Sequence, residues 1–163
     1  MVPRDKEDWN RILSGGVAAG VFGGIVVALF GLAANVLEGR DFWLAFKGAG
    51  VPFLGERAMQ PGFDLEAVIV GALSHMAVSI AWAVPFAMLV YGLTRGTTLV
   101  SGVLWGFIVW VGMYYVLLPM LGLQQIPASV PVGMAIVEHV VFGVAVAVGF
   151  LPYQRLKMVL PAH

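Results

Sequence analysis

Two histidines and one glutamate are the side chains of this sequence most able to do chemistry within an otherwise apolar chain. Glu138 and His139 stand side by side near the middle of residues 130–153, which are apolar almost throughout and long enough to cross a bilayer. His75 lies in another apolar stretch, residues 65–93. An ionisable group at that depth costs several kcal/mol unless it is paired, hydrated or turned inward. We therefore expect all three side chains to face protein or a water-accessible seam.

The spacing predicts that the two histidines lie at the same depth. His75 comes ten residues after Leu65, and His139 comes nine residues after Val130. At a rise of about 1.5 Å per residue, both rings lie roughly 14–15 Å along spans that run in the same direction. We expect them to face the interior of a helix bundle and to share a ligand or a hydrogen-bond network.

A shared ligand of the two histidines could be haem b, held by one imidazole on each face. Gly71 and Gly143 each lie one helical turn from a histidine, and small residues there would leave space for a porphyrin. The alternative needs no cofactor, because the two rings can hydrogen-bond each other, Glu138 or Ser79 and form a polar cluster. The residue pattern leaves both interpretations open.

Other chemistry finds less support in the residues. A zinc ion could take His75, His139 and Glu138 as ligands, but adjacent residues point about 100° apart on a helix, so Glu138 and His139 reach one ion only with strain. The chain has no cysteine, which excludes disulfides and thiolate metal sites. It shows no nucleophile elbow, phosphate-binding loop or dinucleotide fingerprint. We assign no catalytic residue and no metal site, and an enzyme is not the favoured interpretation.

The composition identifies the class of protein that must position these residues. Of 163 residues, 60% are hydrophobic and only 11% are charged, whereas roughly a quarter of the residues of a soluble domain are charged. The formal net charge is zero, so nothing suggests a nucleic-acid partner. We predict an all-α fold, a bundle of four transmembrane helices in one membrane domain covering residues 1–163. The predicted spans are residues 12–37, 65–93, 99–119 and 130–153.

The first predicted span carries a row of glycines. Gly16, Gly20 and Gly24 recur every four residues, so they lie on one face of the helix. In lipid, such a row lets a second backbone approach closely. We expect the row to pack against a helix of this molecule or of a partner; room for a flat cofactor is the less favoured alternative.

Residues 38–63 form the longest predicted connection. Phe42, Trp43 and Phe46 fall at helical spacing there, which predicts a short helix lying in the membrane interface. A connection of this length is usually functional or docked, so we expect it to cap the bundle or to bind a neighbouring protein. Asp64 is expected to cap the helix that follows, and Ser129 the last span.

The distribution of Lys and Arg predicts the orientation in the membrane. Six basic residues belong to the N-terminus, the 93–98 turn and the C-terminal tail, against three in the 38–63 connection and none in residues 120–129. The positive-inside rule then places both termini in the cytoplasm. The six are Arg4, Lys6, Arg11, Arg95, Arg155 and Lys157.

Several short motifs resemble small bacterial four-helix inner-membrane proteins of unknown function, YagU-like families among them. The motifs are His75 in the second span, Gly106 to Trp110 and Pro119 to Gly122 in the third, and the His139 to Gly143 stretch in the fourth. The resemblance covers most of residues 12–153. It implies a four-helix fold in the bacterial inner membrane, and it implies no activity.

Two functions follow as hypotheses from different classes. The first is a non-catalytic accessory subunit of a larger bacterial membrane complex, respiratory or photosynthetic, with protein partners on the glycine face and on residues 38–63. The second is a haem b-binding or quinone-linked electron-transfer subunit that uses His75 and His139. An absorption spectrum of the purified protein distinguishes the two.

Overall fold

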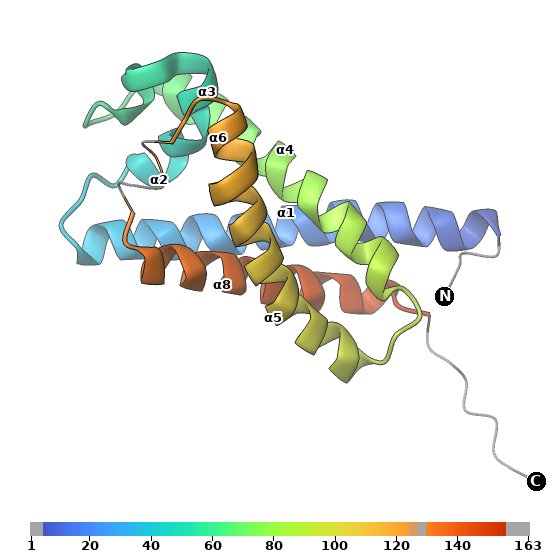
Figure 1. The fold of residues 1–163 in the computed structure, drawn as a ribbon. Helices are drawn as coiled ribbons and strands as arrows, with labels where there is room; N and C mark the ends of the chain where they lie inside the picture. The colour runs from blue at the N-terminus through green and yellow to red at the C-terminus, as the bar shows by residue number, and fades with distance from the viewer. Residues whose placement is uncertain (1–4, 125, 127–129, 156–163) are drawn as a thin grey trace, which may run out of the picture.

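The computed structural model describes residues 5–124, 126 and 130–155, and this part of the chain is helical, without a strand (Figure 1). Four of its helices are long and apolar enough to cross a membrane, which confirms the predicted fold class. They are α1 (Lys6–Leu37), α4 (Leu65–Val90), the third span (Arg95–Met120) and α8 (Val132–Phe150). A short 3-10 helix, η4 (Leu151–Tyr153), extends α8.

The third span is not a uniform α-helix. It begins as α5 (Arg95–Val111), passes through a π-helical segment η3 (Gly112–Leu117) and ends as α6 (Leu118–Met120). Segments of π-helix are rare and occur frequently at functional sites.

Capping side chains decide where three of the spans begin. Asp64 accepts a hydrogen bond from the Ala67 N–H at 3.1 Å, as its sequence position predicts. The first span begins earlier than expected because Asp5 caps it, accepting from the Asp8 N–H at 2.8 Å. The third also begins earlier, capped by Thr94. Ser129 lies outside the described residues.

The four spans pack in a row in which α1 and α8 form the centre. α1 packs against α4 on one side and α8 on the other, and α8 packs in turn against α5. α4 and α5 contact each other much less, although the chain connects them directly. The start of α1 and the end of η4 lie at one end of this bundle, and the 38–63 segment lies at the other (Figure 1).

Glycines permit close approach at two helix crossings. A Cβ atom added at Gly20 would lie 2.6 Å from the Cα of Ile80 in α4, and Gly16 and Gly24 face the same helix. A Cβ at Gly143 of α8 would collide with the carbonyl of Gly102 in α5. The glycine row of α1 therefore packs against the protein's own α4, which covers it and leaves no exposed glycine face for a partner.

Residues 38–63 fold into a cap, here called the cap segment, that lies over α4. It contains α2 (Leu44–Lys47), η1 (Gly48–Gly50), α3 (Val51–Leu54) and η2 (Gly55–Met59). Its aromatic residues Phe42, Trp43 and Phe46 contact one another, with ring centroids 4.9–6.3 Å apart. A side chain at Gly71 of α4 would collide with the Phe46 carbonyl, so the cap segment rests directly on the α4 backbone.

A buried lysine holds the cap segment together. The ammonium of Lys47 is fully buried and donates to the carbonyls of Gln60 and Gly62, and it lies 3.6 Å from Oδ2 of Asp41. Asp41 also accepts from the N–H groups of Trp43 and Gly62. Desolvation raises the pKa of Asp41, but these two N–H groups and Lys47 outweigh it and hold the pKa below its ordinary value of 3.8.

Candidate functional site

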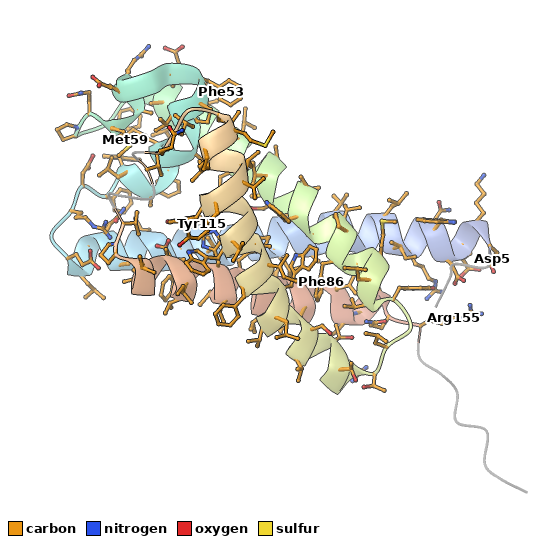
Figure 2. All side chains as sticks on the ribbon, viewed as in Figure 1. Asp5, Phe53, Met59, Phe86, Tyr115 and Arg155 are labelled. Atoms are coloured by element: carbon orange, nitrogen blue, oxygen red, sulfur yellow. The ribbon has the colours of Figure 1, made fainter. Side chains whose placement is uncertain are left out.

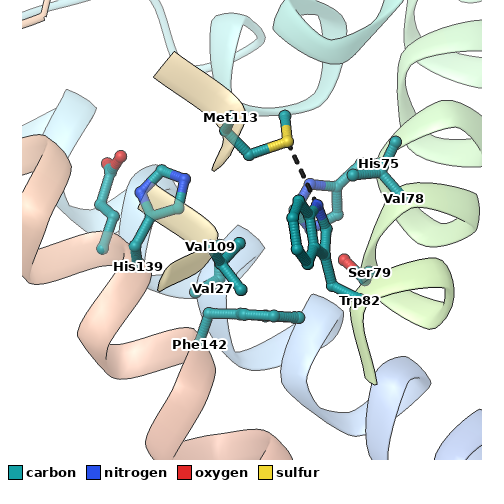
Figure 3. A pocket seen from close by; sticks show the side chains of 10 residues that line it. Val27, His75, Val78, Ser79, Trp82, Val109, Met113, His139 and Phe142 are labelled. Atoms are coloured by element: carbon teal, nitrogen blue, oxygen red, sulfur yellow. Dashed lines mark hydrogen bonds between the residues drawn. The ribbon is translucent and has the colours of Figure 1, made fainter. Parts of the chain in front are cut away.

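A cavity of about 200 Å³ brings together the three ionisable residues of the apolar spans. His75 reaches it from α4, and Glu138 and His139 reach it from α8. Figure 3 shows the two imidazoles on facing walls of this hollow. All four spans contribute to its lining, which also includes Val27, Val78, Ser79, Trp82, Val109, Met113 and Phe142.

Each imidazole is fixed by a backbone carbonyl rather than by the other imidazole. Nε2 of His75 lies 2.9 Å from the carbonyl oxygen of Gly24 in α1, and Nδ1 of His139 lies 2.7 Å from that of Ala135, one turn earlier in α8. A carbonyl oxygen only accepts, so each of these nitrogens carries the proton. The second nitrogen of each ring has no hydrogen bond to the described residues.

Glu138 lies near two charged residues at the start of the cap segment. Its carboxylate forms no hydrogen bond with the described residues, and Arg40 and Glu38 of the cap end are the charged groups that act on it. Arg40 itself is paired with Glu38, at 2.8 Å. Glu138 therefore lies toward the cap end of the cavity, where a Cβ atom added at Gly31 of α1 would lie 3.7 Å from its Oε1.

Aromatic residues form the rest of the site. The ring of Tyr114, in the π-helical segment, packs edge-on against His139 with centroids 5.5 Å apart. The indole N–H of Trp82 donates to the sulfur of Met113 at 3.3 Å, the dashed line in Figure 3. Trp82 also lies against Gly112, where an added Cβ would come 2.6 Å from its ring.

The residues do not fit a haem. The cavity of about 200 Å³ is smaller than the roughly 300–1,000 Å³ of typical ligand pockets. Gly71 and Gly143 were expected to leave space for a porphyrin, but backbone fills both positions: the cap segment lies on Gly71, and α5 crosses at Gly143. The site therefore has room for a small ring and not for a macrocycle.

A polar network that the sequence did not predict lies at the end of the bundle where α1 begins. Asp8 of α1 accepts from the Tyr91 hydroxyl at 2.6 Å and from the Arg155 guanidinium at 3.0 Å. Gln154 donates to the Val90 carbonyl and to the Thr98 hydroxyl. Figure 2 shows Asp5 and Arg155 at this end, far from Phe53 and Met59 of the cap segment.

These hydrogen bonds connect α1, α4 and α5 with the residues that follow η4. They also affect the pKa of Tyr91, which lies just after α4. Burial, followed by the hydrogen bond to the Asp8 carboxylate, raises the pKa of Tyr91 to about 12. The sequence shows three acidic residues, Asp5, Glu7 and Asp8, just before the first apolar span, and nothing in it distinguishes Asp8 from the other two. Nothing in the sequence identifies its partners, which lie 83 and 147 residues away.

A second missed feature is the glycine pair of α5. Gly102 and Gly106 are four residues apart, the same small-residue spacing as in the first span, and they contact α8 at Gly143 and His139. A Cβ at Gly106 would lie 2.5 Å from the His139 carbonyl, so this crossing sets the position of His139 relative to α5. The spacing could have identified this contact.

The described residues hold no group of three His, Asp or Glu side chains arranged for a metal ion. No protein-family model, curated protein or solved structure matches this chain.

Proposed function

We propose that this chain is a non-catalytic, ligand-binding subunit of a bacterial inner membrane, and that its ligand lies in the cavity between His75 and His139. The observation that carries the proposal is the convergence of His75, Glu138 and His139 on one cavity among four apolar spans. Polar groups at that depth are costly and mark functional sites by default. A mostly apolar hollow with a few convergent polar groups is typical of a ligand site.

Within this proposal, the subunit is an accessory part of a larger membrane complex, respiratory or photosynthetic, and resembles YagU-like proteins. The glycine row of α1 no longer supports a partner, because α4 covers it. The cap segment does support a partner, because three of its large apolar side chains are exposed: Phe53 is 72% exposed, Met59 43% and Phe63, its last residue, 60%. Both termini lie on the cytoplasmic side in this proposal, as the distribution of basic residues predicts.

The alternative of a haem b subunit loses its support, because the space beside Gly71 and Gly143 is filled by backbone. We therefore expect the purified protein to show no haem absorption. A quinone-linked role needs only a ring-sized site and stays compatible with the cavity of about 200 Å³.

The test is whether the cavity binds a small ring compound. We would measure the unfolding temperature of the protein in phosphatidylcholine nanodiscs against increasing benzene, phenol, cyclohexanol and pyridine. At least one compound should raise the unfolding temperature of the wild-type protein in a concentration-dependent way. Val27→Phe, which fills the cavity from α1, should abolish the effect.

The control is Val26→Phe, one residue away on the same helix. Val26 lines a different, wholly apolar hollow between α1 and α8, so the added ring does not enter the cavity. If Val26→Phe removes the stabilisation as fully as Val27→Phe does, or if no ring compound stabilises the wild-type protein, the proposed function is wrong.

A further inference from the structure

We propose that the ligand of the cavity is a lipid-soluble phenol. Its hydroxyl-bearing ring would lie between His75 and His139, and its single apolar chain would lie in a groove between α4 and the third span. This inference rests on the function proposed above, because it names the ligand class of the same site.

The protonation of the two imidazoles determines which hydrogen-bonding group the ligand needs. The backbone carbonyls of Gly24 and Ala135 fix the proton on Nε2 of His75 and on Nδ1 of His139. In a neutral imidazole the other nitrogen is then an acceptor. A charged ring among four apolar spans would carry a large desolvation cost. Both imidazoles therefore offer an acceptor, and a ligand that complements either ring must bring a hydrogen-bond donor, for which we propose a hydroxyl group.

The volume of the cavity limits the polar part of the ligand to a single ring. An apolar cavity of about 150 Å³ in a well-studied lysozyme variant binds benzene. The cavity here measures about 200 Å³, which accommodates one six-membered ring with a hydroxyl substituent. The apolar walls of the cavity, Val27, Val109 and Phe142, suit the faces of such a ring.

An adjoining groove explains why the ligand should carry an apolar chain. The groove has a volume of about 510 Å³ and lies between α4 and the π-helical part of the third span, where these helices contact each other little. Its walls are almost wholly apolar and include Pro85, Gly112 and Leu117. Val78 and Trp82 line both the groove and the cavity, so the two hollows meet at these side chains.

Trp82 lies at the junction of the cavity and the groove. Its N–H donates to the sulfur of Met113, a weak acceptor, and its ring packs between Gly112 and the ring of Trp105, whose centroid lies 6.1 Å away. Helix irregularities flank it on both walls, Pro85 on α4 and the π-helical turn that starts at Gly112. Rotation of Trp82 would connect the groove, which faces lipid, with the polar cavity.

The first experiment compares 4-octylphenol with 4-octylanisole in phosphatidylcholine nanodiscs, with the unfolding temperature measured against the mole fraction of probe in the bilayer. The two probes share ring and chain, but only the phenol donates a hydrogen bond. We expect the phenol to stabilise the wild-type protein at an about tenfold lower mole fraction, the ratio that one net hydrogen bond provides. One hydroxyl donates to one acceptor, so the single variants His75→Phe and His139→Phe, each of which keeps a ring in place, should show which imidazole accepts from it. The double variant His75→Phe/His139→Phe removes both acceptors, so 4-octylphenol and 4-octylanisole should then stabilise the protein at the same mole fraction.

The second experiment tests the groove. Val116→Trp narrows the groove on the third span and should weaken stabilisation by 4-octylphenol while leaving that by phenol unchanged. Val148→Trp is the matched control, because Val148 is a similarly exposed valine on α8 outside the groove.

Each failure has its own meaning. Equal effects of 4-octylphenol and 4-octylanisole on the wild-type protein, or a stronger effect of octylammonium, would overturn the choice of a hydroxyl donor. An unchanged response of Val116→Trp to 4-octylphenol would overturn the groove as the site of the chain. In these cases small rings still stabilise the wild-type protein and not Val27→Phe, so the proposed function stands. The proposed function fails when no ring compound binds, or when Val26→Phe removes the stabilisation as fully as Val27→Phe.

Discussion

The hydroxyl of Tyr91 donates a hydrogen bond of 2.6 Å to Oδ1 of Asp8, and so ties the end of α4 to the first turn of α1. Both side chains are at least nine-tenths buried, at 2% and 5% exposure. A buried carboxylate needs such partners, because an unsatisfied charged acceptor is costly. Asp8 is thus a structural residue that joins two of the spans.

Tyr91→Phe should destabilise the protein by about 1–3 kcal/mol, because it removes one hydrogen bond from the Asp8 carboxylate and leaves Arg155 as a charged partner. The loss would appear in thermal unfolding in detergent, followed by circular dichroism. Tyr115→Phe is the control, since Tyr115 is 63% exposed and should change the unfolding temperature little. Equal effects would show that the hydrogen bond contributes nothing measurable.

The raised pKa of Tyr91 predicts a loss of stability in alkali. The pKa is about 12 in the folded protein and 10.0 at its ordinary value, so the unfolded chain loses this proton first. The contribution of Tyr91 is therefore fully present below pH 10 and is lost as the pH rises from 10 to 12. The difference in unfolding temperature between the wild-type protein and Tyr91→Phe should shrink over this range; a constant difference would contradict the assignment.

The lowered pKa of Asp41 predicts that the cap segment, and not the rest of the protein, loses structure in acid. Its pKa is lower in the folded protein than its ordinary value of 3.8, so its contribution is present above that pH and is lost as the pH falls through the folded value. Proteolytic cleavage within residues 38–63 by an acid-stable protease should accelerate below about pH 4. Asp41→Asn should be cleaved quickly at pH 6 as well, whereas Glu56→Gln, an exposed acid of η2, should behave as the wild-type protein.

Gly20→Ala should destabilise the α1–α4 crossing. The added Cβ would lie 2.6 Å from the Cα of Ile80, a backbone atom that can move only with its helix, and overpacking of this kind costs about 1–3 kcal/mol. Gly31→Ala is the matched control on α1, because its Cβ would meet only Glu138 at an ordinary 3.7 Å. Similar unfolding temperatures for the two variants would show that α4 can move away from α1 without loss of stability.

The orientation can be tested with single cysteines in this cysteine-free chain. Gly48 has open space beside its Cα, so Gly48→Cys should fold normally. With both termini in the cytoplasm, an impermeant thiol reagent added to intact cells should label position 48 and not position 162. The opposite labelling would reverse the orientation.

The sequence by itself determined the class of protein and the approximate extent of its helices. A stretch of about 20 apolar residues must satisfy its backbone hydrogen bonds internally in lipid, so it forms a helix whatever surrounds it. The cap at Asp64 follows from local chemistry in the same way. The early starts at Asp5 and Thr94 were missed because polar residues at a helix end carry no apolar signal.

Only the tertiary structure decided which surfaces meet. Lipid chains are as apolar as leucine, so lipid-facing and helix-facing apolar residues look alike in a sequence, and small residues only permit a contact. Gly71 and Gly143 illustrate this: their spacing from His75 and His139 suggested space, but the cap segment and α5 occupy it. The convergence of the two histidines on one cavity was expected from their depth, whereas their carbonyl partners depend on the rotation of each helix about its own axis. That rotation is set by close packing at Gly24 and Gly106, contacts between residues far apart in the chain.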